Sequence, residues 1–224
     1  MATTKTTKAK KKLLNDLEII SLYMNDVLER HEAPKNVFIF CKKHAIDESD
    51  FYSFFGSLNA LRQEIWVKFF ENSVATIEKE PAFETYSDKN KLLTLYFTLF
   101  EILTLNRSYV LFSLKENKEG LKNLKNLTLF RNHFKAYIVS KIKSKPSEVF
   151  GKVAKVTEPV FSEGAWLQFL FLLKFWIEDT SKGFEKTDVL IEKSVNTVVD
   201  LLDTKPLESL FDLGKFLWKE KMQS

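Results

Sequence analysis

The sequence predicts an all-α protein, and two observations support this class. The 224 residues include only 6 Gly and 5 Pro, too few for the many tight turns of a β protein of this length. Long segments instead repeat apolar residues every three or four positions, which places those residues on one face of a helix. A chain of this length forms one or two domains with a substantial core.

The N-terminus is predicted to be a basic disordered tail over residues 1–12. It holds five lysines and no acidic residue, without apolar periodicity. Residues 13–61 have the opposite balance, with eight acidic and four basic side chains. The tail is therefore the part of this region whose charge suits an anionic partner; a merely solubilising end is the alternative interpretation.

Helical spacing predicts a first helix from about Leu13 to Glu29, which Ala33-Pro34 ends. The stretch from Asn36 to Leu61 is predicted to hold two short helices joined by a tight turn at Ala45-Ile46-Asp47. We expect the Asp47 carboxylate to cap the second of them. Two short helices joined in this way form a helix-turn-helix, whose second helix can lie in a DNA major groove.

The rest of the chain is predicted to continue as helices separated by short breaks. Their expected ranges are 58–79, 92–105, 109–114, 121–142, 164–180, 184–202 and 206–218. Pro146 and Pro159 are expected to bracket an irregular piece. The most apolar run, 165–173, is interrupted by Gln168 and is too short to cross a bilayer, so no membrane span is predicted.

Several classes of chemistry are not expected. The three histidines, His31, His44 and His133, show no metal-ligand spacing to each other or to Cys41. No nucleophile elbow, phosphate-binding glycine loop or dinucleotide motif occurs, so we predict no catalytic residue, no metal and no cofactor, and the protein is not expected to be an enzyme. A single cysteine and a polar N-terminus without a signal peptide predict a cytoplasmic protein.

The predicted helix-turn-helix resembles the N-terminal module of the tetracycline-repressor (TetR) family of transcriptional regulators. Phe40-Cys41 stands where that family has an Ile-Ala pair, and Ala45-Ile46-Asp47 stands where it has Gly-Val-Ser. The run 52–55, Tyr-Ser-Phe-Phe, keeps the family's aromatic spacing, and Leu61 fits the first buried position of the next helix. Outside Asn36–Leu61 the resemblance is one of helix order only.

The same stretch departs from the family pattern in its polar residues. Leu58 replaces a lysine that touches a phosphate in the family, and the acidic run 48–50 replaces small or basic residues. Phe54 stands where a polar phosphate contact is common. These departures leave the predicted fold unchanged and weaken the expectation of DNA binding.

The resemblance implies a TetR-like architecture with a three-helix module over 13–57 and a larger helical ligand-binding and dimerisation domain over 58–224. It also implies a homodimer that pairs through helices 164–180 and 184–202, because a two-fold dimer needs a self-complementary apolar patch. The alternative is that these two helices are core helices of a monomer.

The function implied by the resemblance is a ligand-responsive regulator that binds double-stranded DNA. Phosphate contacts are expected from Lys35 and Asn36, and groove contacts from Ser49, Asp50, Tyr52 and Ser53. A small apolar ligand is expected to bind among Trp66, Phe70, Phe100, Tyr109, Phe112, Phe134 and Trp166, each of which could instead be plain core. The abundance of Phe, 21 residues, suits such a site and equally suits an AT-rich genome.

A second function remains open at this stage. A TetR-like fold can bind lipids or other small apolar ligands after it has lost DNA binding, and the acidic residues of 13–61 favour this alternative. The basic tail and the intact turn favour the regulator.

Overall fold

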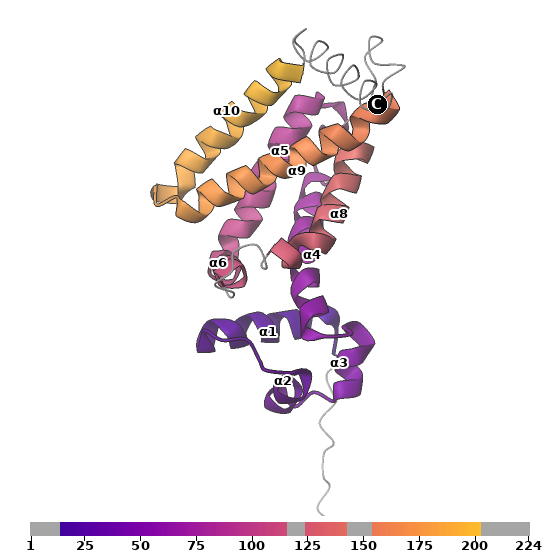
Figure 1. The fold of residues 1–224 in the computed structure, drawn as a ribbon, viewed down its shortest axis with the longest axis vertical. Coiled ribbons are helices and arrows are strands. Elements are labelled where there is room, and N and C mark those ends of the chain that lie inside the picture. The colour runs from indigo at the N-terminus through magenta and orange to yellow at the C-terminus, as the bar shows by residue number, and fades with distance from the viewer. Residues whose placement is uncertain (1–13, 116–123, 143–153, 203–224) are drawn as a thin grey trace, which may run out of the picture. The chain divides into compact units, whose positions relative to one another are not determined.

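The computed structural model describes residues 14–115, 124–142 and 154–202, and the regular structure in these ranges is entirely helical (Figure 1). The all-α class is therefore confirmed. The chain divides into two compact units: the first holds residues 1–65 and 107–127, and the second holds 66–106 and 128–224. The units divide at Ile65, inside helix α4; a domain boundary at residue 58 stays a prediction.

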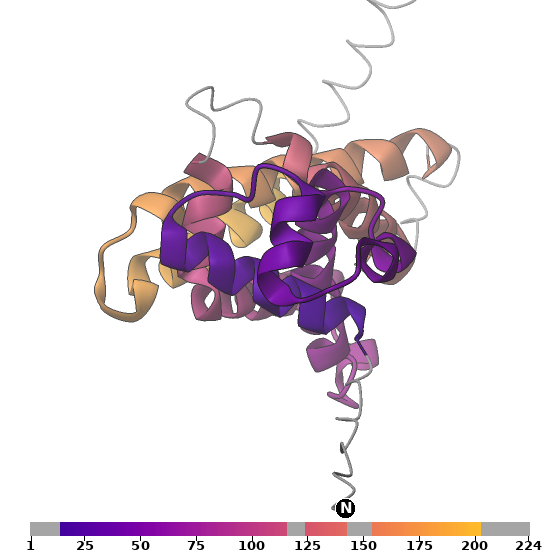
Figure 2. The same cartoon turned by 90° about the horizontal axis from the view of Figure 1, so that it is seen from below.

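The first unit contains α1 (Asp16–Arg30), α2 (Val37–His44), α3 (Glu48–Phe54), the start of α4 (Leu58–Ile77), α6 (Arg107–Lys115) and η2 (Leu124–Leu127). Viewed from below, α2 lies in front of α1 (Figure 2). The rings of Tyr23 and Phe40, with centroids 6.0 Å apart, join these two helices. α1 begins at Asn15, whose side chain accepts a hydrogen bond from the Glu18 N–H at 2.8 Å.

The second unit contains the rest of α4, η1 (Phe83–Thr85), α5 (Asp88–Leu105), α8 (Thr128–Tyr137), the π-helical turn η3 (Ile138–Ile142), α9 (Ala154–Glu178), η5 (Lys182–Phe184) and α10 (Glu185–Leu202). α10 packs against α5 and α9, and α8 packs against α9 (Figure 1). A buried hydrogen bond also joins α5 to α9, because the Tyr96 hydroxyl donates to the Ala165 carbonyl oxygen at 2.8 Å.

The start of α9 corrects one prediction. The helix begins at Ala154, so Pro159 lies in its second turn and Gly164 lies in its interior, rather than preceding and opening the helix. Pro159 has no backbone N–H to donate to the carbonyl of residue 155, so one hydrogen bond of the helix is missing there. Gly183 does follow the helix in the left-handed conformation, with φ 64°, as its position after the periodic segment predicts.

A carboxylate organises the connection between α9 and α10. Asp179 accepts hydrogen bonds from the backbone N–H and hydroxyl of Ser181 at 2.8 and 2.7 Å, and from those of Thr187 at 3.0 and 2.7 Å. Burial by itself raises the pKa of Asp179, but these four donors outweigh it and lower the pKa to about 2. The ionised carboxylate therefore stabilises this connection.

Some predicted elements lie outside the described residues. They are the basic tail 1–12, the start of the helix predicted over 121–142 and the final helix 206–218. Among the helices that the structure does describe, none combines the length and the apolar character needed to cross a bilayer.

Candidate nucleic-acid interface and apolar core

The corner, which we define as α2, the turn 45–47 and α3, is built by local backbone signals. The Asn36 side chain caps α2 by accepting a hydrogen bond from the Ile39 N–H at 2.9 Å. Ala45 ends α2 in the left-handed conformation, with φ 53°, and the Ile46 N–H donates to the Cys41 carbonyl oxygen at 3.0 Å. Asp47 takes the N-cap position of α3, but its side chain makes no capping hydrogen bond, contrary to expectation.

Buried aromatic rings hold the two corner helices together. Phe40 of α2 and Phe51 of α3 are both fully buried, with ring centroids 6.0 Å apart. Phe55, also buried, packs on Phe51 at 5.9 Å. Phe40 and Cys41 are both buried at the positions of the family's Ile-Ala pair. Phe40 therefore fills the core position that isoleucine fills in the family, and the helix-turn-helix geometry is retained.

The predicted DNA contacts lie largely on the surface of the corner. Lys35 and Asn36 are exposed before α2, and Ser49 and Ser53 are exposed on α3. Tyr52, also on α3, is 50% exposed. The sixth predicted residue, Asp50, is half-buried and does not share the fully exposed face.

The charge of the corner is uneven. α3 carries Glu48 and Asp50 in its first turn and no basic side chain. The last turn of α2 carries Lys42, Lys43 and His44, but the two lysines are partly engaged. The Lys42 ammonium lies 5.8 Å from the centroid of the Phe38 ring, and Lys43 is paired with a carboxylate of α1. α3 therefore offers no positive charge of its own to a DNA phosphate.

The carboxylate that pairs with Lys43 is Asp26, which is buried within α1. Arg30 lies 3.2 Å and His44 lies 3.6 Å from its oxygens. Burial alone raises the pKa of Asp26, yet the Lys43 hydrogen bond and the neighbouring positive charges bring it below its usual value. Asp26 therefore stays ionised and ties α2 to α1.

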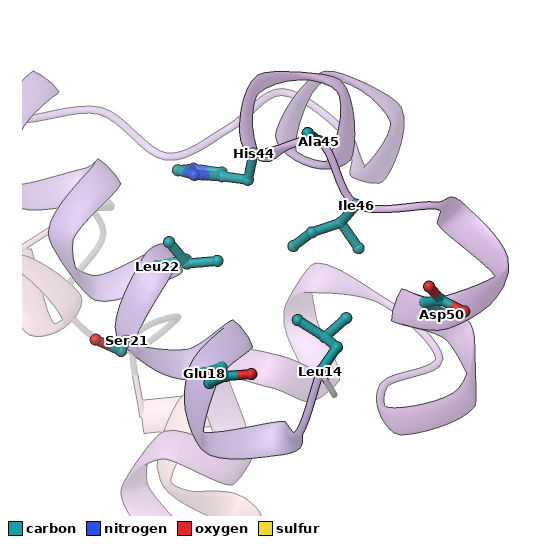
Figure 3. Close-up of a pocket in the computed structure, with 8 residues that line it drawn as sticks. All are labelled: Leu14, Glu18, Ser21, Leu22, His44, Ala45, Ile46 and Asp50. Atoms are coloured by element: carbon teal, nitrogen blue, oxygen red, sulfur yellow. The ribbon is translucent and has the colours of Figure 1, made fainter. Parts of the chain in front are cut away.

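An open pocket of about 400 Å³ lies beside the corner (Figure 3). Its lining comes from the start of the first helix and from the segment that runs from the end of α2 into α3: Leu14, Glu18, Ser21, Leu22, His44, Ala45, Ile46 and Asp50. The pocket joins apolar side chains to two carboxylates, and none of the seven predicted ligand residues lines it.

Five of the predicted ligand residues meet in the second unit. We call the following cluster of contacting rings the aromatic core: Trp66, Phe70, Phe100, Phe130, Phe134, Trp166 and Phe169. Phe134 lies at its centre, 5.9 Å from Phe70 and 5.8 Å from Trp166, measured between ring centroids.

The other two predicted ligand residues, Tyr109 and Phe112, belong to α6 in the first unit. Tyr109 is buried there against Tyr23, with centroids 6.4 Å apart, and Phe112 is half-buried. Sequence reasoning omitted Phe130 and Phe169 from the candidate site. Their spacing from Phe134 and Trp166, one helical turn in each case, was the signal that could have included them.

A row of apolar side chains lies exposed on α9. Leu167, Phe171 and Phe175 follow one another at intervals of four residues and are 64%, 54% and 37% exposed. Val189 of α10 is also exposed. Contiguous exposed apolar side chains commonly mark a protein interface.

A comparison with protein families decides the classification. Residues 91–217, more than half of the chain, match the family model described as "Tetracyclin repressor-like, C-terminal domain". The chain belongs to the tetracycline repressor-like family. The predicted family is thus confirmed, by a part of the sequence that does not include the corner.

The TetR-family match begins at residue 91 and covers α5, α6, α8, α9 and α10. The corner lies outside it, so the TetR assignment and the geometry of the corner are independent observations. A search of curated proteins found no match. In the ranges described, no three His, Cys, Asp or Glu side chains are grouped as metal ligands, and Cys41 is a buried free thiol.

Proposed function

We propose that this TetR-family protein is a homodimeric transcriptional regulator that binds double-stranded DNA and responds to a small apolar ligand. The observation that carries the proposal is the corner, in which α3 is supported by buried Phe40 and Phe51 while Ser49, Tyr52 and Ser53 stay exposed. A helix that is packed on one face and exposed on the other can enter a major groove.

The dimer is supported by the exposed row on α9. Leu167, Phe171 and Phe175 form an apolar strip that an identical strip on a second copy would cover. In dimeric regulators with a helix-turn-helix, the two recognition helices reach successive major grooves about 34–36 Å apart.

The ligand response is supported by the aromatic core. Ring-lined sites bind apolar molecules, and a ligand changes DNA affinity when it binds one conformation of the dimer better than another. α4 takes part in both the first unit and the aromatic core, so a ligand held by Trp66 and Phe70 would act on the helix that follows the corner. No catalytic step is part of this proposal.

The acidic surface of α3 favours a second candidate function. With Glu48 and Asp50 in its first turn and no basic residue, α3 lacks the charge that supplies most non-specific DNA affinity. The alternative is a TetR-fold protein that binds a lipid or another small apolar ligand and does not bind DNA.

Binding to random duplex DNA at a series of salt concentrations separates the two functions. A regulator should lose affinity steeply with salt, with a log–log slope of about −0.9 for each neutralised phosphate. Removal of residues 1–12 should flatten the slope without abolishing binding, because the corner still contacts the DNA. If the intact protein shows no salt-dependent binding, the regulator is excluded and the ligand-binding protein remains.

A further inference from the structure

Buried polar side chains in the second unit generally have hydrogen-bond partners. The Trp176 indole N–H donates to the Thr104 hydroxyl at 3.1 Å, and the Tyr96 hydroxyl donates to the Ala165 carbonyl at 2.8 Å. Trp66 and Tyr137 differ, because neither the Trp66 Nε1–H nor the Tyr137 hydroxyl has a hydrogen-bond partner among the described residues. An unsatisfied buried donor destabilises the fold, so each case needs an explanation.

The side chains of Trp66 and Tyr137 each contact a ring of the aromatic core. Trp66 is 1% exposed and stacks on Phe130, with centroids 6.1 Å apart and an interplanar angle of 19°. Phe70, one turn further along α4, contacts Phe130 at 5.5 Å and meets Tyr137 edge-on at 5.8 Å. Phe130 and Phe70, which contact each other, thus link Trp66 to Tyr137.

The aromatic neighbours of Trp66 disfavour a buried water as the partner of its N–H donor. A buried water usually makes about three hydrogen bonds, so it needs several polar partners around it. The ring neighbours of Trp66 are Phe69 and Phe130, which offer none. A phenylalanine at position 66 would fill similar space without leaving a donor unsatisfied.

We propose that the ligand of the aromatic core carries a neutral hydrogen-bond acceptor and that the Trp66 Nε1–H recognises it. The inference rests on the proposed apolar-ligand function and adds the chemical class: an apolar ketone, ester or ether rather than a pure hydrocarbon. The acceptor satisfies the indole N–H, while the rings cover the apolar remainder of the molecule.

The acceptor is neutral because the aromatic core lacks a cation for an ionised one. A buried carboxylate needs a positive partner. Lys91, a buried lysine of the same unit, is already engaged: its ammonium lies 3.3 Å from the Lys141 carbonyl oxygen and 3.9 Å from a Glu84 carboxylate oxygen. A ketone or ester oxygen needs only the indole donor.

The test compares two probes of the same shape, 2-acetylnaphthalene and 2-isopropenylnaphthalene, which differ by a carbonyl oxygen in place of a methylene group. Their binding to the full chain is measured by calorimetry. In Trp66→Phe, affinity for the ketone should fall about fivefold or more, while affinity for the hydrocarbon should change less than about twofold. Trp176→Phe is the matched control, because it removes an indole N–H that already has a partner, and it should leave the ratio of the two affinities unchanged.

Equal changes for both probes, or no change for either, overturn the role of Trp66 and leave the apolar-ligand function standing. Failure of both probes to bind the unmodified protein overturns the inference and also argues against the aromatic core as a ligand site. A second measurement uses the unmodified protein and so does not require a variant to fold. In ¹⁵N-labelled protein, the Trp66 indole signal should shift with the ketone and not with the hydrocarbon, and equal shifts with both probes would contradict the proposal.

Discussion

Lys43 of α2 donates a hydrogen bond to the carboxylate of Asp26 in α1. Asp26 is 2% exposed, whereas the Lys43 side chain is 30% exposed. The contact therefore holds one end of the corner against α1 through a charge that is shielded from water. It also withdraws one of the few lysines near α3 from any phosphate.

Replacing Asp26 by Asn should destabilise the protein by about 2–3 kcal/mol. This loss is smaller than the roughly 3–5 kcal/mol for a fully buried ion pair, because Lys43 can reach water. Urea unfolding at neutral pH measures the change. Glu29→Gln, an exposed position on the same helix, is the control and should stay within about 0.5 kcal/mol of the unmodified protein. A similar stability for both variants would show that the pair contributes little.

The Asp179 carboxylate predicts a loss of stability in acid. Its pKa in the folded protein is about 2, below its value in the unfolded chain, so its stabilising effect is present at neutral pH. The effect is lost as the pH falls from about 4 towards 2 and the carboxyl group becomes protonated. Asp179→Asn should therefore lower the urea midpoint at pH 7, and its difference from the unmodified protein should shrink in acid. The exposed neighbour Glu178, changed to Gln, should show no such convergence.

Ala45→Gly should stabilise the protein. Ala45 has φ 53°, a conformation that costs a residue with a Cβ roughly 1–2 kcal/mol. Glycine removes this cost but adds freedom to the unfolded chain, so a net gain of about 0.5–1 kcal/mol is expected. Ala75→Gly, at an exposed position inside α4, should change stability in the opposite direction by a similar amount. Thermal and urea unfolding of both variants measure the two signs.

Phe171→Lys should convert the proposed dimer into a monomer. The substitution places a charge in the middle of the exposed row on α9, where pairing would bury it without a partner. Sedimentation at several protein concentrations reports the change in mass. Phe97→Lys changes an exposed ring on α5 and should leave the dimer intact. A dimer that survives Phe171→Lys would remove α9 from the interface.

Tyr52→Glu should weaken binding to duplex DNA at least about tenfold at moderate salt. The substitution adds a negative charge to the exposed face of α3, which the proposal directs at the phosphates and groove. Phe97→Glu adds the same charge on α5 and is the matched control. Anisotropy titrations of both variants give the comparison, and equal losses would mean that net charge alone, and not α3, determines binding.

Local structure was the most predictable part of this chain. The corner was expected at Asn36–Leu61, and α2 and α3 lie there because their ends are specified by neighbouring residues, such as the Asn36 cap. Proline and glycine disfavour a helix interior and so predict a later start for α9, but the helix includes both Pro159 and Gly164.

Contacts between distant helices could not be predicted in the same way. Helical spacing relates Phe130 to Phe134 and Phe169 to Trp166, but it does not reveal that the two pairs pack on each other. The ligand site that the family resemblance implies also includes Tyr109, whereas Tyr109 packs against Tyr23 in the first unit. Such pairings depend on how helices cross, which a single periodic pattern does not encode.

The exposed row of Leu167, Phe171 and Phe175 makes the stability of the protein depend on its concentration. If pairing covers these side chains, part of the free energy that keeps each chain folded comes from its copy, and dilution reduces that share. The melting temperature should then rise with protein concentration, and a concentration-independent value would contradict the pairing. If the protein binds DNA as proposed, occupancy of a binding site would increase more than in proportion to expression, because only the dimer carries two recognition helices.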